Sequence, residues 1–252
     1  MKKWFILILI ASVILPIGGV SQTSDPAQPQ KRIALVFGNS DYVNGIRLKN
    51  PVNDADLMEA HLKNLGFKVI KQLNAGRDSM IKSIREFSKK LPDYNVALFY
   101  YSGYGVQVDG TNYFIPVNAK LEHKEDVSFD AIPVTMITDQ LKRNSNNTNI
   151  VILDACRNNP YRSWIKGDET GFKALGLFNK ALISFSASEG TTTVDSDGAN
   201  GIFTEELVKQ MEIPQPIEKV FYNTRKMVMA RSKGQQEPLD WSFLTEDFYF
   251  KK

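Results

Sequence analysis

Short, uninterrupted apolar runs alternate along the chain with longer segments in which apolar residues recur every three or four positions. An unbroken apolar run of strand length is typical of a strand that is buried on both faces, as in a parallel sheet. Such runs predict strands at residues 32–37, 68–73, 96–101, 149–153 and 182–185.

The helical spacing of apolar residues predicts five helices between and after these strands. The first can be capped by Asn53 and ends at Gly66. The third is expected at about residues 134–144. The other apolar faces carry Ala55, Met58, Leu62 and Leu65; Ile81, Ile84, Phe87 and Leu91; Phe203, Leu207 and Met211; and Ile217, Phe221, Thr224 and Val228.

Two further segments complete the pattern. Residues 106–117 read as a hairpin with Asp109-Gly110 at its turn, and residues 241–250 read as a strand. Strands that alternate with helices indicate an α/β fold, in which a mostly parallel central sheet has helices on both faces. In such sheets the chemistry lies beyond the C-terminal ends of the strands. Two motifs follow strands directly: SGYG after residues 96–101 and DACRNNP after residues 149–153.

The N-terminus has the features of a secretory signal peptide at residues 1–21. Lys2 and Lys3 precede an apolar run that ends at Leu15, and small residues follow. Residues 22–30 are polar and contain two prolines, which favours a flexible lead-in. We therefore expect an exported protein, periplasmic or secreted, with an uncleaved and membrane-tethering signal as the alternative.

Charge narrows the choice of partners. Of the 31 basic side chains two lie in residues 1–21, which leaves 29 against 28 acidic side chains in the rest. A balanced chain without a basic run gives no electrostatic basis for binding nucleic acid. Nor does it contain a polybasic, amphipathic segment that would bind a membrane surface.

Cys156 is the single cysteine, so an internal disulfide is excluded and the core must provide the stability. Its thiol is either a small buried hydrophobic group or a reactive one. The sequence around it decides between these.

Four stretches together resemble caspase-type cysteine peptidases, in their bacterial metacaspase and orthocaspase branch. They are RIALVFGNSDY with LKNPVNDADLMEAHLKNLGF, VALFYYSGYGVQVDGTNYFIPVNA, NIVILDACRNNP and QQEPLDWSFLTEDFYF. The resemblance covers about residues 31–250 and implies a caspase-like fold for residues 31–252. It also implies a large-subunit-like part at about 31–160, a linker at about 161–180 and a small-subunit-like part at about 181–252.

The resemblance assigns roles to the two motifs. Cys156 stands at the nucleophile position, and the backbone N–H groups of Gly105 and Cys156 match the oxyanion hole. The family's histidine normally stands in SGHG, where this chain has SGYG, so Tyr104 takes its place. Tyr104 lies 52 residues before Cys156, close to the family's spacing.

A basic-residue pocket is implied in the same way. Asp54, Asp154 and Ser102 match residues that give metacaspases their preference for arginine or lysine, because a carboxylate in a cleft pairs with a guanidinium or ammonium group. Without the resemblance, Asp54 would read as a helix N-terminal charge and Asp154 as a turn residue.

The tyrosine changes the expected chemistry. Imidazole, with a pKa of about 6.5, can activate a thiol and then protonate the leaving amine, whereas a phenol with a pKa of about 10 is seldom a base at neutral pH. Removing the base of a catalytic unit can lower turnover on the order of a millionfold. The remaining histidines are His61, within the first helix, and His123, in a charged segment that reads as solvated.

Three functions follow in order. The first is a pseudopeptidase that binds a basic peptide or a protein partner; the second is an active cysteine endopeptidase cleaving after Arg or Lys with an unconventional base. The third is a scaffold or redox-responsive protein with a vestigial cleft. We expect no cofactor, although the resemblance leaves calcium dependence open, because Glu122, Glu125 and Asp126 read as a solvated loop. A monomer is expected.

Overall fold

The computed structural model describes residues 30–44, 47–144, 148–156, 179–188 and 198–252. Its strands are β1 (Arg32–Gly38), β2 (Phe67–Leu73), β3 (Val96–Val108), β4 (Thr111–Phe114), β5 (Ile132–Pro133), β6 (Thr148–Cys156), β7 (Ala181–Phe185) and β8 (Leu239–Ser242). Its α-helices are α1 (Pro51–Asn64), α2 (Arg77–Lys90), α3 (Val127–Asp130), α4 (Thr135–Arg143), α5 (Ile202–Met211) and α6 (Ile217–Arg231), with 3₁₀ turns at Leu91–Asp93 and Lys124–Asp126.

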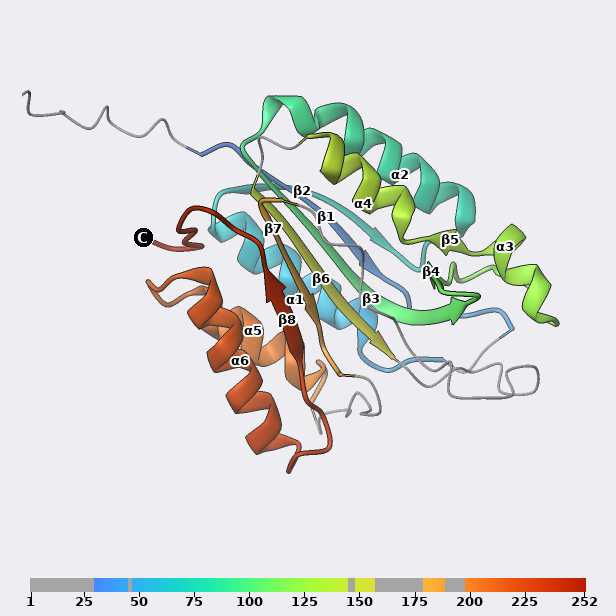
Figure 1. Ribbon diagram of the computed structural model, residues 1–252. Coiled ribbons are helices and arrows are strands. Elements are labelled where there is room, and N and C mark those ends of the chain that lie inside the picture. The colour runs from blue at the N-terminus through green and yellow to red at the C-terminus, as the bar shows by residue number, and fades with distance from the viewer. Residues whose placement is uncertain (1–29, 45–46, 145–147, 157–178, 189–197) are drawn as a thin grey trace, which may run out of the picture.

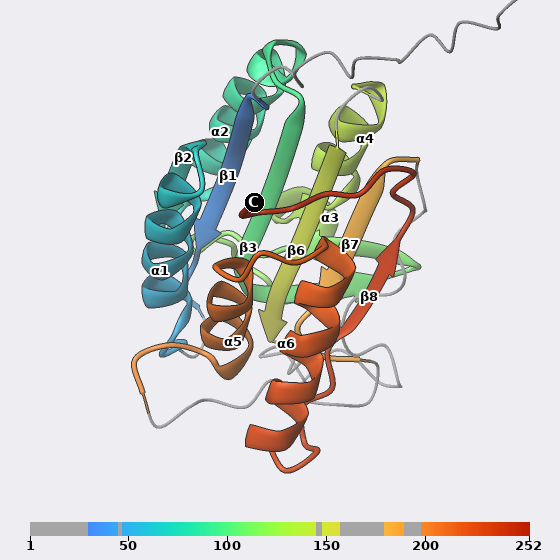
Figure 2. The same ribbon diagram turned by 90° about the vertical axis from the view of Figure 1, so that its left-hand side faces the viewer.

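The central sheet has the strand order β2-β1-β3-β6-β7-β8, and only β8 runs antiparallel to its neighbour. Helices α2 and α4 cover one face and α1, α5 and α6 cover the other (Figures 1 and 2). The predicted α/β fold with a mostly parallel sheet and helices on both faces is confirmed.

Side chains of β1 show why the strand runs are unbroken. Ile33, Leu35 and Phe37 join the cluster under α2 and α4, while Ala34 and Val36 join the cluster under α1, α5 and α6. Successive side chains of a strand point to opposite faces, so a strand covered on both sides must be apolar at every position.

Strand β3 differs from the sequence prediction at its end. The SGYG motif does not stop the strand: β3 runs on to Val108 and turns back into β4. Asp109 and Gly110, with φ of 50° and 79°, form the predicted hairpin turn, for which both residues need a positive φ. The extension carries a third apolar cluster beyond the main sheet, made of Tyr42, Tyr104, Val106, Val108, Ile115, Ala119, Leu121, Val127 and Ala131.

Two other boundaries are corrected. Asn53 is not the cap of α1, because the helix already begins at Pro51; its side chain instead donates to the carbonyl of Ala199 at 2.8 Å. The strand predicted at residues 241–250 is shorter, since β8 ends at Ser242. The residues beyond it leave the sheet, and Phe248 and Phe250 pack into the cluster under α1, α5 and α6.

Several predictions fall outside the described residues: the signal peptide at residues 1–21, the lead-in up to residue 29, and the linker at about 161–180 except its last two residues. Within the described ranges no helix is long and apolar enough to span a membrane. In the same part of the chain, no three His, Cys, Asp or Glu side chains are grouped so that they could hold a metal ion.

Candidate active site

The two motifs meet at the C-terminal end of the sheet. Strands β3 and β6 are parallel neighbours, with Ser102 opposite Asp154 and Tyr104 opposite Cys156. Residues in register on adjacent strands lie side by side, so the predicted nucleophile and the residue at the predicted histidine position are neighbours. The side chain of Cys156 lies outside the described part of the structure.

Tyr104 is packed into the third cluster and is only 4% exposed. Its ring lies against that of Tyr42, with 4.7 Å between centroids. Its backbone is held by two phenols: its N–H donates to Tyr42 Oη at 2.8 Å, and its carbonyl accepts from Tyr101 Oη at 2.7 Å. The aromatic side chain is therefore part of a core, fixed on both sides.

Gly103 makes this arrangement possible. Its φ is 155°, and a Cβ at this position would lie 2.6 Å from Tyr42 Oη and 2.8 Å from Tyr101 Oη. A side chain here would displace both phenols, so the glycine of SGYG is required by the close approach of the tyrosines.

Gly105, predicted to contribute to an oxyanion hole, lies opposite Phe114 in the β3–β4 hairpin. The preceding residue, Tyr104, accepts a hydrogen bond from the N–H of Ile115 at 3.1 Å. Because hydrogen-bonded and non-hydrogen-bonded pairs alternate along an antiparallel ladder, the N–H of Gly105 points away from β4. It therefore faces the edge of β3 along which β6 runs, and its oxyanion role stays a prediction.

Neither histidine lies at this end of the site. His61 is in the last turn of α1, at the opposite end of the strands, where its Nδ1 is 3.0 Å from Oε1 of Glu212. His123 is exposed, and the adjacent Lys124 pairs with Asp109 at the tip of the hairpin, five residues beyond Tyr104. The structure brings no described imidazole to Cys156.

The structure does bring two of the predicted pocket carboxylates together. Asp54 comes from the first turn of α1 and Asp154 from β6, and they are 2% and 8% exposed. Both face Gly201 at the start of α5: a Cβ there would lie 3.2 Å from Asp54 Oδ2 and 3.7 Å from Asp154 Oδ2. The glycine thus keeps the space between the two acids open.

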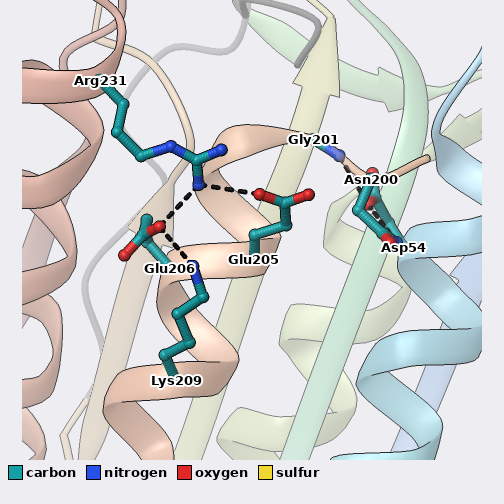
Figure 3. Close-up of polar contacts among 7 residues, drawn as sticks. All are labelled: Asp54, Asn200, Gly201, Glu205, Glu206, Lys209 and Arg231. Carbon is teal, nitrogen blue, oxygen red and sulfur yellow. Dashed lines mark hydrogen bonds and ion pairs between the residues drawn. The ribbon is translucent and has the colours of Figure 1, made fainter. Parts of the chain in front are cut away.

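Hydrogen bonds fix each carboxyl group. Asp54 Oδ1 accepts from the N–H of Gly201 at 2.8 Å and from the side chain of Asn200 at 3.0 Å (Figure 3). Asp154 Oδ2 accepts from the hydroxyl of Thr204 at 2.7 Å, and Tyr100 Oη lies 2.7 Å from the same Thr204 oxygen. Since Thr204 gives its only proton to Asp154, Tyr100 must donate to Thr204.

Burial, followed by the negative charge of Asp154, raises the pKa of Asp54 to about 8. The hydrogen bonds from Gly201 and Asn200 oppose this rise, and the charge of Glu205 adds to it. Burial and the same two aspartates raise the pKa of Tyr100 well above its ordinary value, so this phenol is a neutral donor. Ser102, the third predicted pocket residue, is buried and hydrogen-bonds to Tyr100.

A charged network on α5 and α6 borders the acid pair (Figure 3). One guanidinium nitrogen of Arg231 lies 2.8 Å from Glu205 and 2.6 Å from Glu206, and Lys209 lies 2.8 Å from Glu206. Glu205 therefore acts on Asp54 while it is itself paired with a cation.

Sequence reasoning missed the residues that α5 contributes, namely Asn200, Gly201, Thr204 and Glu205. They lie about 150 residues after Asp54 and about 50 after Asp154 in the sequence. The one available signal was a glycine directly before a helix-forming segment, and this is too common to identify a pocket.

The comparisons agree with this geometry. The sequence profile described as Caspase domain matches residues 31–249. The chain belongs to the caspase family. This caspase domain is 25% identical over 224 residues to mucosa-associated lymphoid tissue lymphoma translocation protein 1 of Homo sapiens, a match covering 86% of this chain and 26% of that protein.

The Mus musculus homolog of the same protein is 27% identical over 186 residues, covering 72% of this chain and 21% of the homolog. The caspase domain studied here thus spans about a quarter of the length of these curated relatives. The predicted caspase-like cysteine peptidase family is confirmed, while the bacterial metacaspase and orthocaspase branch stays a prediction.

Proposed function

We propose that this chain is an exported caspase-like domain that binds a basic peptide segment or a partner protein and does not hydrolyse it. The observation that supports this most directly is the state of Tyr104, which lies opposite Cys156 with its ring buried against Tyr42. A buried phenol cannot take on the positive charge that an imidazolium carries beside a thiolate.

The position of the histidines supports the same conclusion. His61 is bound to Glu212 at the other end of α1, and His123 lies beside the hairpin tip. Proton transfer requires a group within hydrogen-bonding reach of the nucleophile or one water away from it. An active peptidase would need a base other than these two side chains.

The acid pair supports binding of a cation. Asp54 and Asp154 are buried at the end of the sheet where the ligands of α/β proteins bind, with Glu205 close by. The recorded hydrogen bonds to the pair come from neutral groups. A guanidinium or ammonium group would supply the missing positive charge, which favours an arginine or lysine side chain as the bound group.

Peptide binding and cleavage can be separated in one experiment. The mature chain, a Cys156→Ala variant and a Tyr104→His variant are incubated with a fluorogenic arginine peptide, with and without calcium, and binding of the uncleaved peptide is measured by calorimetry. We expect the wild-type chain to bind the peptide without cleaving it. We expect cleavage to appear with Tyr104→His and to disappear when Cys156→Ala is added.

The opposite result is equally clear. Cleavage by the wild-type chain that Cys156→Ala abolishes would mean that an active peptidase uses another base. Absence of binding to arginine, lysine and matched neutral peptides alike would remove the binding function.

A further inference from the structure

The two acids of the pocket are held in unequal ways. Both hydrogen bonds described for Asp54 end on its Oδ1, from Gly201 at 2.8 Å and Asn200 at 3.0 Å. An oxygen that accepts two N–H donors is the unprotonated oxygen of a carboxyl group, so a proton on Asp54 belongs on Oδ2. This is the oxygen that faces Asp154 across the space above Gly201.

Asp154 is held as an anion. It accepts the hydroxyl proton of Thr204, and Thr204 in turn is the acceptor for Tyr100. A chain of donors that ends on a carboxylate stabilises its negative charge. Two buried carboxylates at one site cannot both ionise easily, so the better-solvated member keeps the charge and the other keeps the proton.

We propose that Asp54 and Asp154 hold one shared proton in the ligand-free protein, carried on Asp54 Oδ2, and that an entering guanidinium or ammonium group displaces it. This inference rests on the proposed binding function for its second half only. The displaced proton passes to the solvent buffer, and the pocket charge changes from one negative unit to two as the cation binds.

The groups around Asp54 all act in this direction. Asp154 from β6, Glu205 from α5 and Tyr100 from β3 are the titratable neighbours that act on it, and none of these described groups is a cation. The Arg231 guanidinium is engaged by Glu205 and Glu206. The high pKa of Asp54, about 8, agrees with the geometry.

Ligand selection then depends on pH. A cationic side chain must displace the proton, so its apparent affinity should fall about tenfold for each pH unit below about 8. A neutral side chain of the same shape, such as citrulline in place of arginine, leaves the proton in place and should bind with an affinity that does not change over this range. The pocket should therefore favour arginine over citrulline by a factor that grows with pH.

The proton is tested first without a ligand. Carboxyl ¹³C NMR of aspartate-labelled protein should show one carboxyl group titrating near pH 8 in the wild type and none in Asp54→Asn. The matched control is Asp56→Asn, an exposed acid on the same helix that pairs with Lys71, and it should retain this titration. If every aspartate of the wild type titrates below pH 6, the shared proton is excluded.

The displacement is tested next by calorimetry with a short arginine peptide in phosphate and in Tris, two buffers with different ionisation enthalpies. Release of about one proton per peptide at pH 7 is expected, and none for the citrulline peptide. Tight arginine binding without proton release overturns the displacement and leaves the binding function intact. A titration near pH 8 with no binding of either peptide overturns the binding function and the displacement while the proton assignment stands.

Discussion

The phenol oxygen of Tyr42 accepts the backbone N–H of Tyr104 at 2.8 Å, while the two rings pack with their centroids 4.7 Å apart. Tyr42 lies in the segment after β1 and Tyr104 in the extension of β3, so one contact joins two strand ends beside Cys156. This contact holds the residue at the predicted histidine position in a fixed place.

Removing the phenol oxygen of Tyr42 should destabilise the fold. In Tyr42→Phe the ring contact remains but the buried N–H of Tyr104 loses its acceptor, which costs about 1–3 kcal/mol. Urea denaturation measures the change in the free energy of unfolding. Tyr222→Phe, at a half-exposed position on α6, is the control and should change it by less than about 0.5 kcal/mol. Equal values for the two variants would contradict the clamp.

Gly103→Ala should be more disruptive than an ordinary surface substitution. The added Cβ would overlap Tyr42 Oη at 2.6 Å and Tyr101 Oη at 2.8 Å, both on buried side chains. We expect a loss of about 2–4 kcal/mol, measured by thermal unfolding. Gly66→Ala is the comparison, because its φ is also positive but its Cβ would meet nothing within 4 Å. The difference between the two variants isolates the steric overlap from the backbone strain.

The stability of the protein should fall as pH rises, through the acid pair. The folded protein keeps the Asp54 proton up to about pH 8, whereas the unfolded chain releases it near 3.8. The native state therefore binds more protons between these values, and this one group lowers the free energy of unfolding by about 1.4 kcal/mol for each pH unit in that window.

Asp54→Asn removes this dependence while it keeps the shape of the side chain. The free energy of unfolding of the variant minus that of the wild type should rise steadily from pH 5 to pH 7 in urea titrations. Asp56→Asn should keep the wild-type slope. Parallel curves for wild type and Asp54→Asn would contradict a proton held on Asp54.

Arg32 should tie the C-terminal residues to the start of β1. Its guanidinium donates to the carbonyls of Tyr249 and Phe250, at 2.9 and 2.6 Å, and to that of Leu65 at 3.2 Å. It also lies over the rings of Phe67 and Phe248. Arg32→Leu should cost about 1–3 kcal/mol and should increase amide hydrogen exchange at residues 248–250.

The control for this substitution is Arg47→Leu. Arg47 pairs with Asp41, but its side chain is 80% exposed, and such pairs contribute little. Its loss should leave both the stability and the exchange near the C-terminus unchanged. If Arg32→Leu also left the exchange unchanged, the apolar packing of Phe248 and Phe250 alone would be holding these residues.

The sequence was sufficient for the parts of the fold that burial alone determines. The central strands were predicted because both of their faces are covered, as Leu35 and Val36 illustrate by joining opposite clusters. The end of β3 was misjudged because glycine and serine normally interrupt a strand, and the phenols that hold Gly103 come from other segments. Residues 243–250 were misjudged because their apolar side chains pack from an irregular segment.

The site was predictable where a motif carried it. The pairing of Tyr104 with Cys156 and the approach of Asp54 to Asp154 followed from the family resemblance and the sheet order. Thr204 and Gly201, which set the hydrogen bonds of the acids, could not be found, because a threonine and a glycine near a helix start have no distinctive pattern. Their roles arise from α5 packing beside α1, far apart in the sequence.

The direction of the parallel strands gives the domain a front and a back. The described chain enters at Arg32, where Tyr249 and Phe250 are also fastened, and the acid pair lies at the other end of the strands, roughly 20 Å away. Anything joined ahead of residue 30 is thus attached at the rear. Immobilising the domain through that side, on a bead, a sensor chip or a bilayer, leaves the pocket facing outward toward its ligand.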